Sequence, residues 1–197
     1  EILPLLENFG EFSNVCVKGL MAIPPISRFP GENLEFFQEI PRRAYVFLAV
    51  VNYGTHTMTR TNDVSKTAVV IGATSGIGRE VAAQLASQGY RVGITGRREA
   101  LLEELARSAP QRYETAAFDI AQPDACDRLA ALTGSLGSPE LIVFCSGTGD
   151  LNDGLDYRIE EATNRVNVDG FTRTVDWCYR YFECRGGGCL AAVTSVM

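Results

Sequence analysis

The chain has 197 residues, of which 46% are apolar and 21% charged, which is typical of one globular domain or one domain plus a fragment. The net charge is −6 and no run of five or more basic residues occurs, so we expect no nucleic-acid partner. The longest apolar run, Ala44 to Val51, is far shorter than the roughly 20 residues that span a bilayer, so no membrane partner is expected either.

The cysteine pattern excludes two further classes of protein. Six cysteines occur without C-x-x-C spacing, and His56 is the single histidine, so the sequence predicts no metal site. A small disulfide scaffold has little core, which does not fit this composition. We therefore expect reduced, mostly buried cysteines and a cytoplasmic location.

Residues 1–57 differ from the rest of the chain. Val15 to Ile23 reads as a strand, Pro30-Gly31 opens a short helix that reaches Ile40, and Asn52 to Asp63 reads as a loop. We interpret this part as an irregular N-terminal extension and not as an independent domain. Residues 58–197, which begin at Met58, would then be the natural unit.

Part of the extension resembles another family. KGLMAIPP followed by ENLEFF, within residues 1–40, is similar to a fragment of the pyridoxal-phosphate homeostasis proteins, which are alanine-racemase-like barrels. One strand and one helix cannot close such a barrel, and the segment lacks the lysine that would hold pyridoxal phosphate. We carry no function over from this resemblance.

The stretch 67–98 organises the rest of the chain as strand, glycine turn, helix and strand. A short apolar run from Ala68 to Ile71 is followed by Gly72, Gly76 and Gly78 at the spacing G-x-x-x-G-x-G. Such glycines allow a tight turn, close approach of backbone to a phosphate, and close packing of helix on strand. The helix that begins near Gly76 presents free N–H groups to a pyrophosphate. The context predicts a dinucleotide site.

Strands and helices alternate regularly from residue 67 onward. The pattern predicts strands at 68–71, 91–95, 113–118, 140–145 and 189–194, and helices near 77–88, 98–108, 123–134 and 158–184. Five strands separated by helical crossovers predict an α/β fold with a Rossmann-type, doubly wound parallel sheet.

The end of the second strand indicates which cofactor is bound. An NAD site places an acid there for the ribose 2′-OH, whereas an NADP site uses arginine. Here the strand ends in Thr95-Gly96-Arg97-Arg98, without an acid, so we expect NADP, with NAD less favoured. The alternative is that the two arginines only begin a solvated helix, although arginine is unfavourable in a first helical turn.

Residues 67–197 resemble the first part of a short-chain dehydrogenase/reductase, through its fifth strand. The resemblance is carried by Gly72, Gly76 and Gly78, by the N-x-x-G feature of Asn167 and Gly170 in RVNVDGF, and by Ser195 in AVTSVM. The family's N-N-A-G turn reads FCSG here and keeps only the glycine, Gly147. The chain ends two residues after Ser195, before the Tyr-x-x-x-Lys pair of the family.

The resemblance implies hydride transfer between a nicotinamide and a small carbonyl or alcohol substrate. Ser195 would hold the substrate oxygen and Asn167 would maintain a water relay. Asp119 would accept from the adenine amino group, or, as the residues alone equally allow, cap the next helix. The implied cofactor contacts are Gly72, Thr74, Ser75, Gly76, Ile77, Gly78, Arg97, Arg98, Asp119, Ile120, Ser146 and Gly147.

The missing Tyr-x-x-x-Lys pair bears on activity, and without it we expect the chain to be inactive as given. Tyr181 and Arg185 mimic the spacing of that pair, and we expect them to have a packing role. A catalytically inactive nucleotide-binding module and a non-functional truncated fragment are the alternatives. The full-length form would allow a homo-oligomer.

Overall fold

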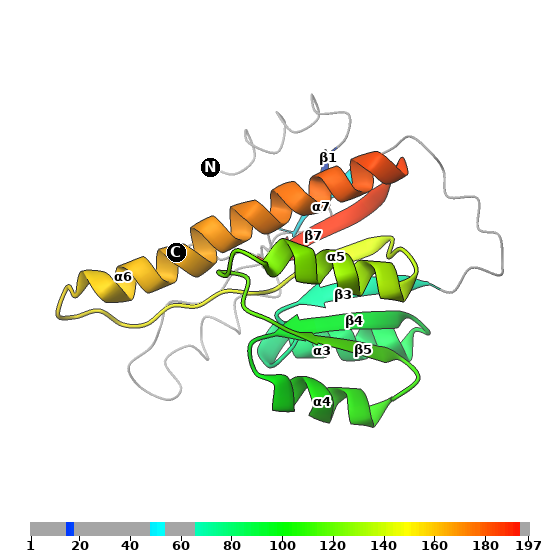
Figure 1. Ribbon diagram of the computed structural model, residues 1–197, viewed down its shortest axis with the longest axis horizontal. Coiled ribbons are helices and arrows are strands. Elements are labelled where there is room, and N and C mark those ends of the chain that lie inside the picture. The colour runs from blue at the N-terminus through cyan, green and yellow to red at the C-terminus, as the bar shows by residue number, and fades with distance from the viewer. Residues whose placement is uncertain (1–14, 18–47, 54–65, 194–197) are drawn as a thin grey trace, which may run out of the picture.

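The computed structural model describes residues 15–17, 48–53 and 66–193 (Figure 1). The fragment resembling the pyridoxal-phosphate proteins lies almost wholly outside these residues, as do Met58 and Ser195. Within the described residues, seven strands form one sheet in the order β1-β2-β7-β6-β3-β4-β5. Those strands and the helices are β1 (Val15–Val17), β2 (Leu48–Tyr53), β3 (Thr67–Ile71), α3 (Gly76–Ser87), β4 (Arg91–Gly96), α4 (Glu99–Ser108), β5 (Tyr113–Ala117), α5 (Ala125–Leu136), β6 (Leu141–Phe144), α6 (Tyr157–Asn164), the π-helical turn η3 (Arg165–Gly170), α7 (Phe171–Arg185) and β7 (Gly188–Val193).

The five strands from β3 to β7 run parallel, which confirms the predicted doubly wound sheet. The central strand β3 is buried along its whole length, as expected for an apolar strand covered on both faces. Ile71 pairs with Thr95 on one side and with Phe144 on the other. The carboxyl ends of β3, β4 and β6 therefore meet at one edge of the sheet.

Helices cover both faces of the sheet (Figure 1). On one face α3 and α4 pack over β3 and β4, with Ala82, Ile94 and Leu102 in the core. On the other face α5 and α7 bury a second core that includes Leu129 and Phe182. The residues that the helices contribute to these cores lie at apolar positions with helical spacing.

The extension contributes two strands to the described sheet. β2 pairs antiparallel with β7, with Leu48 opposite Val193, and β1 pairs with β2. Asn52 and Tyr53 lie in β2, so the predicted loop from Asn52 to Asp63 is wrong at its first two residues. The difference arises because the parallel strands leave the outer N–H and C=O groups of β7 without a partner, and β2 supplies one by pairing along that edge.

The long helix predicted at 158–184 is interrupted. Its middle, η3, is a π-helical turn between α6 and α7. Gly170 ends this turn where a Cβ would lie 3.0 Å from the carbonyl oxygen of Ile120, so the absence of a side chain lets the helix approach that backbone. One extra residue in a turn does not alter the apolar pattern enough to be detected from the sequence.

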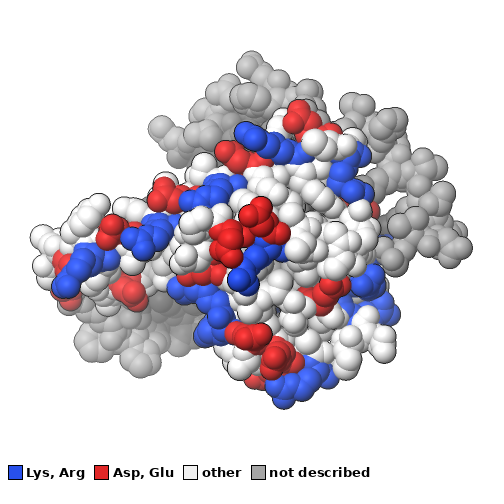
Figure 2. Space-filling view, viewed as in Figure 1, with Lys and Arg blue, Asp and Glu red and all other residues white. Residues whose placement is uncertain are grey.

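Residues 148–164, comprising the loop after β6 and α6, extend away from the sheet, and we call them the arm (Figure 1). α6 buries none of its residues, and Leu151, Leu155 and Tyr157 are 73%, 87% and 71% exposed. On the face seen in Figure 2, acidic and basic side chains are interspersed, along the arm as elsewhere. None of the helices in the described part of the chain combines the length and apolarity needed to cross a membrane.

Candidate cofactor site

The turn after β3 is built on close backbone contacts. Gly72 adopts a φ of +93°, and the N–H groups of Gly72 and Ala73 donate to the carbonyl of Thr95 at 3.0 and 2.8 Å. A Cβ on Gly72 would lie 2.7 Å from the backbone nitrogen of Ser146, and one on Gly78 would overlap the carbonyl oxygen of Gly72. Both positions therefore require glycine. The one at Gly72 lets the turn approach the end of β6, and the one at Gly78 lets α3 approach the turn.

The start of α3 is suited to an anion. Ser75 precedes the helix in an extended conformation and makes no capping hydrogen bond, and the first turn contains no acidic residue. The hydroxyl of Ser75 instead accepts a hydrogen bond from Arg98 at 2.6 Å. The first N–H groups and the positive end of the helix dipole are thus left for a ligand, which fits a pyrophosphate.

A pocket of about 150 Å³ opens beside this turn, at the carboxyl edge of the strands. It is lined by most of the predicted cofactor residues, namely Gly72, Thr74, Ser75, Arg97, Arg98, Asp119, Ile120, Ser146 and Gly147. Gly76, Ile77 and Gly78 do not line it and form the first turn of α3, where Ile77 is exposed. Four further residues line the pocket and were not predicted, namely Gly96, Phe118, Cys145 and Val166. All of them except Val166 directly precede a predicted residue in the sequence, at the end of a strand.

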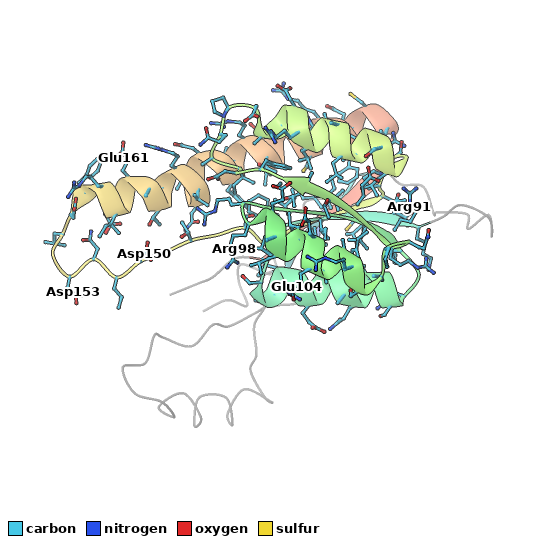
Figure 3. All side chains as sticks on the ribbon, turned by 60° about the horizontal axis from the view of Figure 1, so that its bottom comes forward. Arg91, Arg98, Glu104, Asp150, Asp153 and Glu161 are labelled. Atoms are coloured by element: carbon cyan, nitrogen blue, oxygen red, sulfur yellow. The ribbon has the colours of Figure 1, made fainter. Side chains whose placement is uncertain are left out.

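The two arginines after β4 lie at this edge in different environments. Arg98 donates from Nη2 to the hydroxyls of Thr74 at 2.8 Å and Ser75 at 2.6 Å. Arg97 is 59% exposed, and its Nη1 lies 4.0 Å from Oδ2 of Asp119. Figure 3 shows Arg98 at one end of the sheet and Arg91, which begins β4, at the other. Arg98 is held in place, whereas Arg97 makes a single long ion pair within the described part of the chain.

Asp119 does not cap the next helix. Its Oδ1 accepts from the backbone N–H of Ala121 at 2.9 Å, and α5 begins later, with Asp124 at the N-cap position. The alternative role as a helix cap is therefore wrong, because the chain makes a local turn before α5 starts. The role in holding adenine stays a prediction.

Asn167 holds the loop that follows β6. Its Oδ1 accepts from the N–H of Thr148 at 2.9 Å, and its Nδ2 donates to the carbonyl of Thr148 at 2.6 Å. The side chain, which lies on the π-helical turn η3, thus fixes both backbone groups of one residue next to Gly147. The water relay expected of Asn167 stays a prediction, and Ser195 lies outside the described residues.

Cys145 occupies the second position of the FCSG turn and lines the pocket. Burial raises the pKa of its thiol to about 11, so the group is uncharged at neutral pH. A Cβ on Gly78 would lie 3.1 Å from the Cβ of Cys145, which shows how closely α3 packs here. Cys145 therefore adds a small neutral wall and no charge to the pocket.

Tyr181 lies away from this site. Its hydroxyl contacts the carbonyl of Pro139 at 3.5 Å, just before β6 begins, and its ring stacks on Trp177 with centroids 5.2 Å apart. Arg185 lies over the same ring. These contacts are at the amino edge of the sheet, opposite the pocket, as a packing role requires.

The family assignment follows from comparison with known proteins. The sequence model of the family described as short chain dehydrogenase matches residues 66–197. The chain belongs to the short chain dehydrogenase family. Its relatives include a 7beta-hydroxysteroid dehydrogenase of Clostridium sardiniense, 31% identical over 134 residues that cover 65% of this chain and 51% of the relative. Another is a serine 3-dehydrogenase of Agrobacterium fabrum, 38% identical over 85 residues that cover 43% of this chain and 34% of the relative.

Solved structures of this family share the fold. An actinorhodin polyketide ketoreductase determined with NADPH is 26% identical with a TM-score of 0.57, over 63% of this chain and 51% of that chain. A short-chain dehydrogenase of Streptomyces avermitilis is 26% identical with a TM-score of 0.58, over 64% and 47%. The chain spans about half the length of the curated relatives it matches first.

Proposed function

We propose that this protein is an NADP-dependent oxidoreductase that transfers hydride between a nicotinamide and a carbonyl or alcohol substrate. The observation that carries the NADP assignment is the pair of guanidinium groups, Arg97 and Arg98, that lines the pocket where β4 ends. A carboxylate at that position would favour the ribose 2′-OH of NAD and repel a 2′-phosphate. The acid that does line the pocket, Asp119, follows β5 and has Oδ1 engaged by Ala121.

The residues of the site fit the rest of such a cofactor. The N-terminus of α3 and the backbone of Gly72 suit the pyrophosphate, and Asp119 with Ile120 suits the adenine. Ser146 and Gly147 line the side of the pocket formed by the end of β6. When bound, the nicotinamide supplies the acceptor or donor of the hydride. Asn167 would keep the Thr148 backbone in position, and Ser195 would hold the substrate oxygen.

The relatives support this chemistry. By their names, two of them are dehydrogenases of a hydroxysteroid and of serine, both of which carry a hydroxyl group. One solved relative of 26% identity contains NADPH. These relatives do not favour the alternative of a nucleotide-binding module without catalysis, nor that of a fragment without function.

Titration with NADPH and with NADH, followed by fluorescence, tests the proposal. We expect NADPH to bind more tightly, and Arg98→Gln to weaken NADPH binding about 10- to 100-fold, the range of a lost charge-assisted hydrogen bond. NADH binding should hardly change in this variant. Arg107→Gln on the last turn of α4 is the matched control, since Arg107 is exposed and does not line the pocket. Equal or tighter binding of NADH by the unaltered protein would overturn the NADP assignment.

A further inference from the structure

The side chain of Thr74 packs against Gly96, which has no side chain of its own. A Cβ on Gly96 would lie 2.5 Å from the Cγ2 methyl of Thr74, so the methyl occupies the space that this glycine leaves open. Threonine is branched at Cβ, and fixing its methyl also fixes the direction of its hydroxyl. The end of β4 therefore determines where the Oγ1 atom of Thr74 points.

The hydroxyls of Thr74 and Ser75 both accept hydrogen bonds from the same nitrogen of Arg98. The Nη2 group donates to Thr74 Oγ1 at 2.8 Å and to Ser75 Oγ at 2.6 Å. An Nη2 group has two N–H bonds, one for each hydroxyl, and among the residues that the structure describes the Nε and Nη1 donors have no hydrogen-bond partner. The two hydroxyls therefore hold the guanidinium through one of its three nitrogens.

We infer that Thr74 and Ser75 are positioning residues for cofactor choice, which set the guanidinium of Arg98 before a 2′-phosphate arrives. The inference rests on the proposed function, because it concerns the same site. An exposed arginine loses much rotamer freedom when it binds a phosphate, and the loss is smaller if other contacts already hold the side chain. Among residues 15–17, 48–53 and 66–193, Arg97 has one long ion pair, to Asp119, and no comparable support.

The turn after β3 would thus serve two parts of the cofactor. Its backbone approaches the pyrophosphate, while the side chains of Thr74 and Ser75 act through Arg98 on the 2′-phosphate. NADH lacks that phosphate, so loss of either hydroxyl should affect NADPH binding alone. This selectivity separates a positioning role from a general structural role, which would weaken both cofactors.

The experiment measures dissociation constants for NADPH and NADH in the unaltered protein and in Thr74→Val, Thr74→Ser and Ser75→Ala. Thr74→Val keeps the methyl contact with Gly96 and removes the hydroxyl, whereas Thr74→Ser keeps the hydroxyl. Thr172→Val, at an exposed position on α7, is the control for a threonine hydroxyl elsewhere. We expect Thr74→Val and Ser75→Ala each to weaken NADPH binding roughly tenfold, the effect of about one hydrogen bond, with NADH binding within about twofold. Thr74→Ser should retain most of the NADPH preference.

Three outcomes would overturn the inference: an unchanged ratio of the two constants in Thr74→Val and Ser75→Ala, an equal loss for both cofactors, or tighter NADPH binding. Tighter binding would mean that the hydroxyls compete with the phosphate for Arg98. The unaltered protein reports on the proposed function separately. If it prefers NADPH and the variants keep that preference, only the positioning role fails. If it shows no preference for NADPH, the proposed function fails as well.

Discussion

The sheet with its covering helices and the arm differ in how their residues are held. Around the sheet, two cores bury apolar side chains from α3 and α4 on one face and from α5 and α7 on the other. In the arm, α6 buries none of its residues. The arm is instead held by local polar contacts, in which Asn152 bonds to Asp156 and Glu160, and Asp156 accepts from the N–H of Arg158.

The difference matters because the cofactor site lies where the two regions meet. The glycine turn, the arginines and Asp119 belong to the sheet, and their positions follow from close backbone contacts. The loop after Gly147 leads into the arm and is tied back through Asn167. Exposed polar contacts contribute little stability, so regions held by them open more readily than packed regions. We therefore expect the sheet to be rigid and the arm to open on its own.

The largest effect is expected within the sheet region, at Gly78. In Gly78→Ala the new Cβ would overlap the carbonyl oxygen of Gly72, so α3 or the turn must shift. We expect the free energy of unfolding to fall by about 3 kcal/mol, the upper range for overpacking, and cofactor binding to fall with it. Urea denaturation followed by circular dichroism measures the change.

Gly134 offers a matched control on α5. A Cβ there would meet no atom within 4 Å. Gly134→Ala should raise the free energy of unfolding by about 0.5–1 kcal/mol, because alanine favours the helix. A stability for Gly78→Ala equal to that of the unaltered protein would show that the turn is not rigid, and the contrast between the two regions would weaken.

An intermediate effect is expected at Asn167, where the two regions are tied. Asn167→Ala removes both hydrogen bonds to the backbone of Thr148, which water can partly replace because these groups are not fully buried. The expected loss is about 1 kcal/mol, expressed as faster amide hydrogen exchange in residues 148–156. Asn167→Asp should lose as much or more, since it brings a carboxylate oxygen against the Thr148 carbonyl. Asn164→Ala is the control, and unchanged exchange in Asn167→Ala would show that the arm is held by other means.

The sequence predicted the sheet region well because its signals are local. Apolar runs bounded by glycine indicated the parallel strands, and the spacing of Gly72, Gly76 and Gly78 indicated a phosphate turn that the backbone contacts explain. The sequence also placed Arg98 at the end of the second strand, where it lines the pocket, and its role in binding the cofactor stays a prediction. These features depend on neighbours within a few residues, which a single sequence displays.

Features that depend on distant contacts were not predictable. The bond between Arg98 and Thr74 joins residues 24 apart, and no spacing rule indicates it. The hydrogen bonds of Asn167 to the Thr148 backbone likewise depend on the folded arrangement, as does the pairing of β2 with β7. The π-helical turn was missed because one added residue hardly changes a helical pattern.

The smallest expected effect sharpens the contrast, because it should appear in the arm alone. Leu155 is 87% exposed and has a φ of +52°, a left-handed conformation that is strained for leucine and not for glycine. Leu155→Gly should therefore stabilise the arm by a few tenths of a kcal/mol to about 1 kcal/mol, seen as slower amide exchange around α6. Leu151→Gly, at a 73% exposed position outside the left-handed region, should act in the opposite direction, because glycine there only adds freedom to the unfolded chain.

If the arm opens independently, the urea midpoint of the sheet region stays constant in both variants while exchange in the arm changes. A shift of that midpoint with Leu155→Gly would mean that arm and sheet unfold together, and that the loop beside the cofactor pocket is as rigid as the strands that form it.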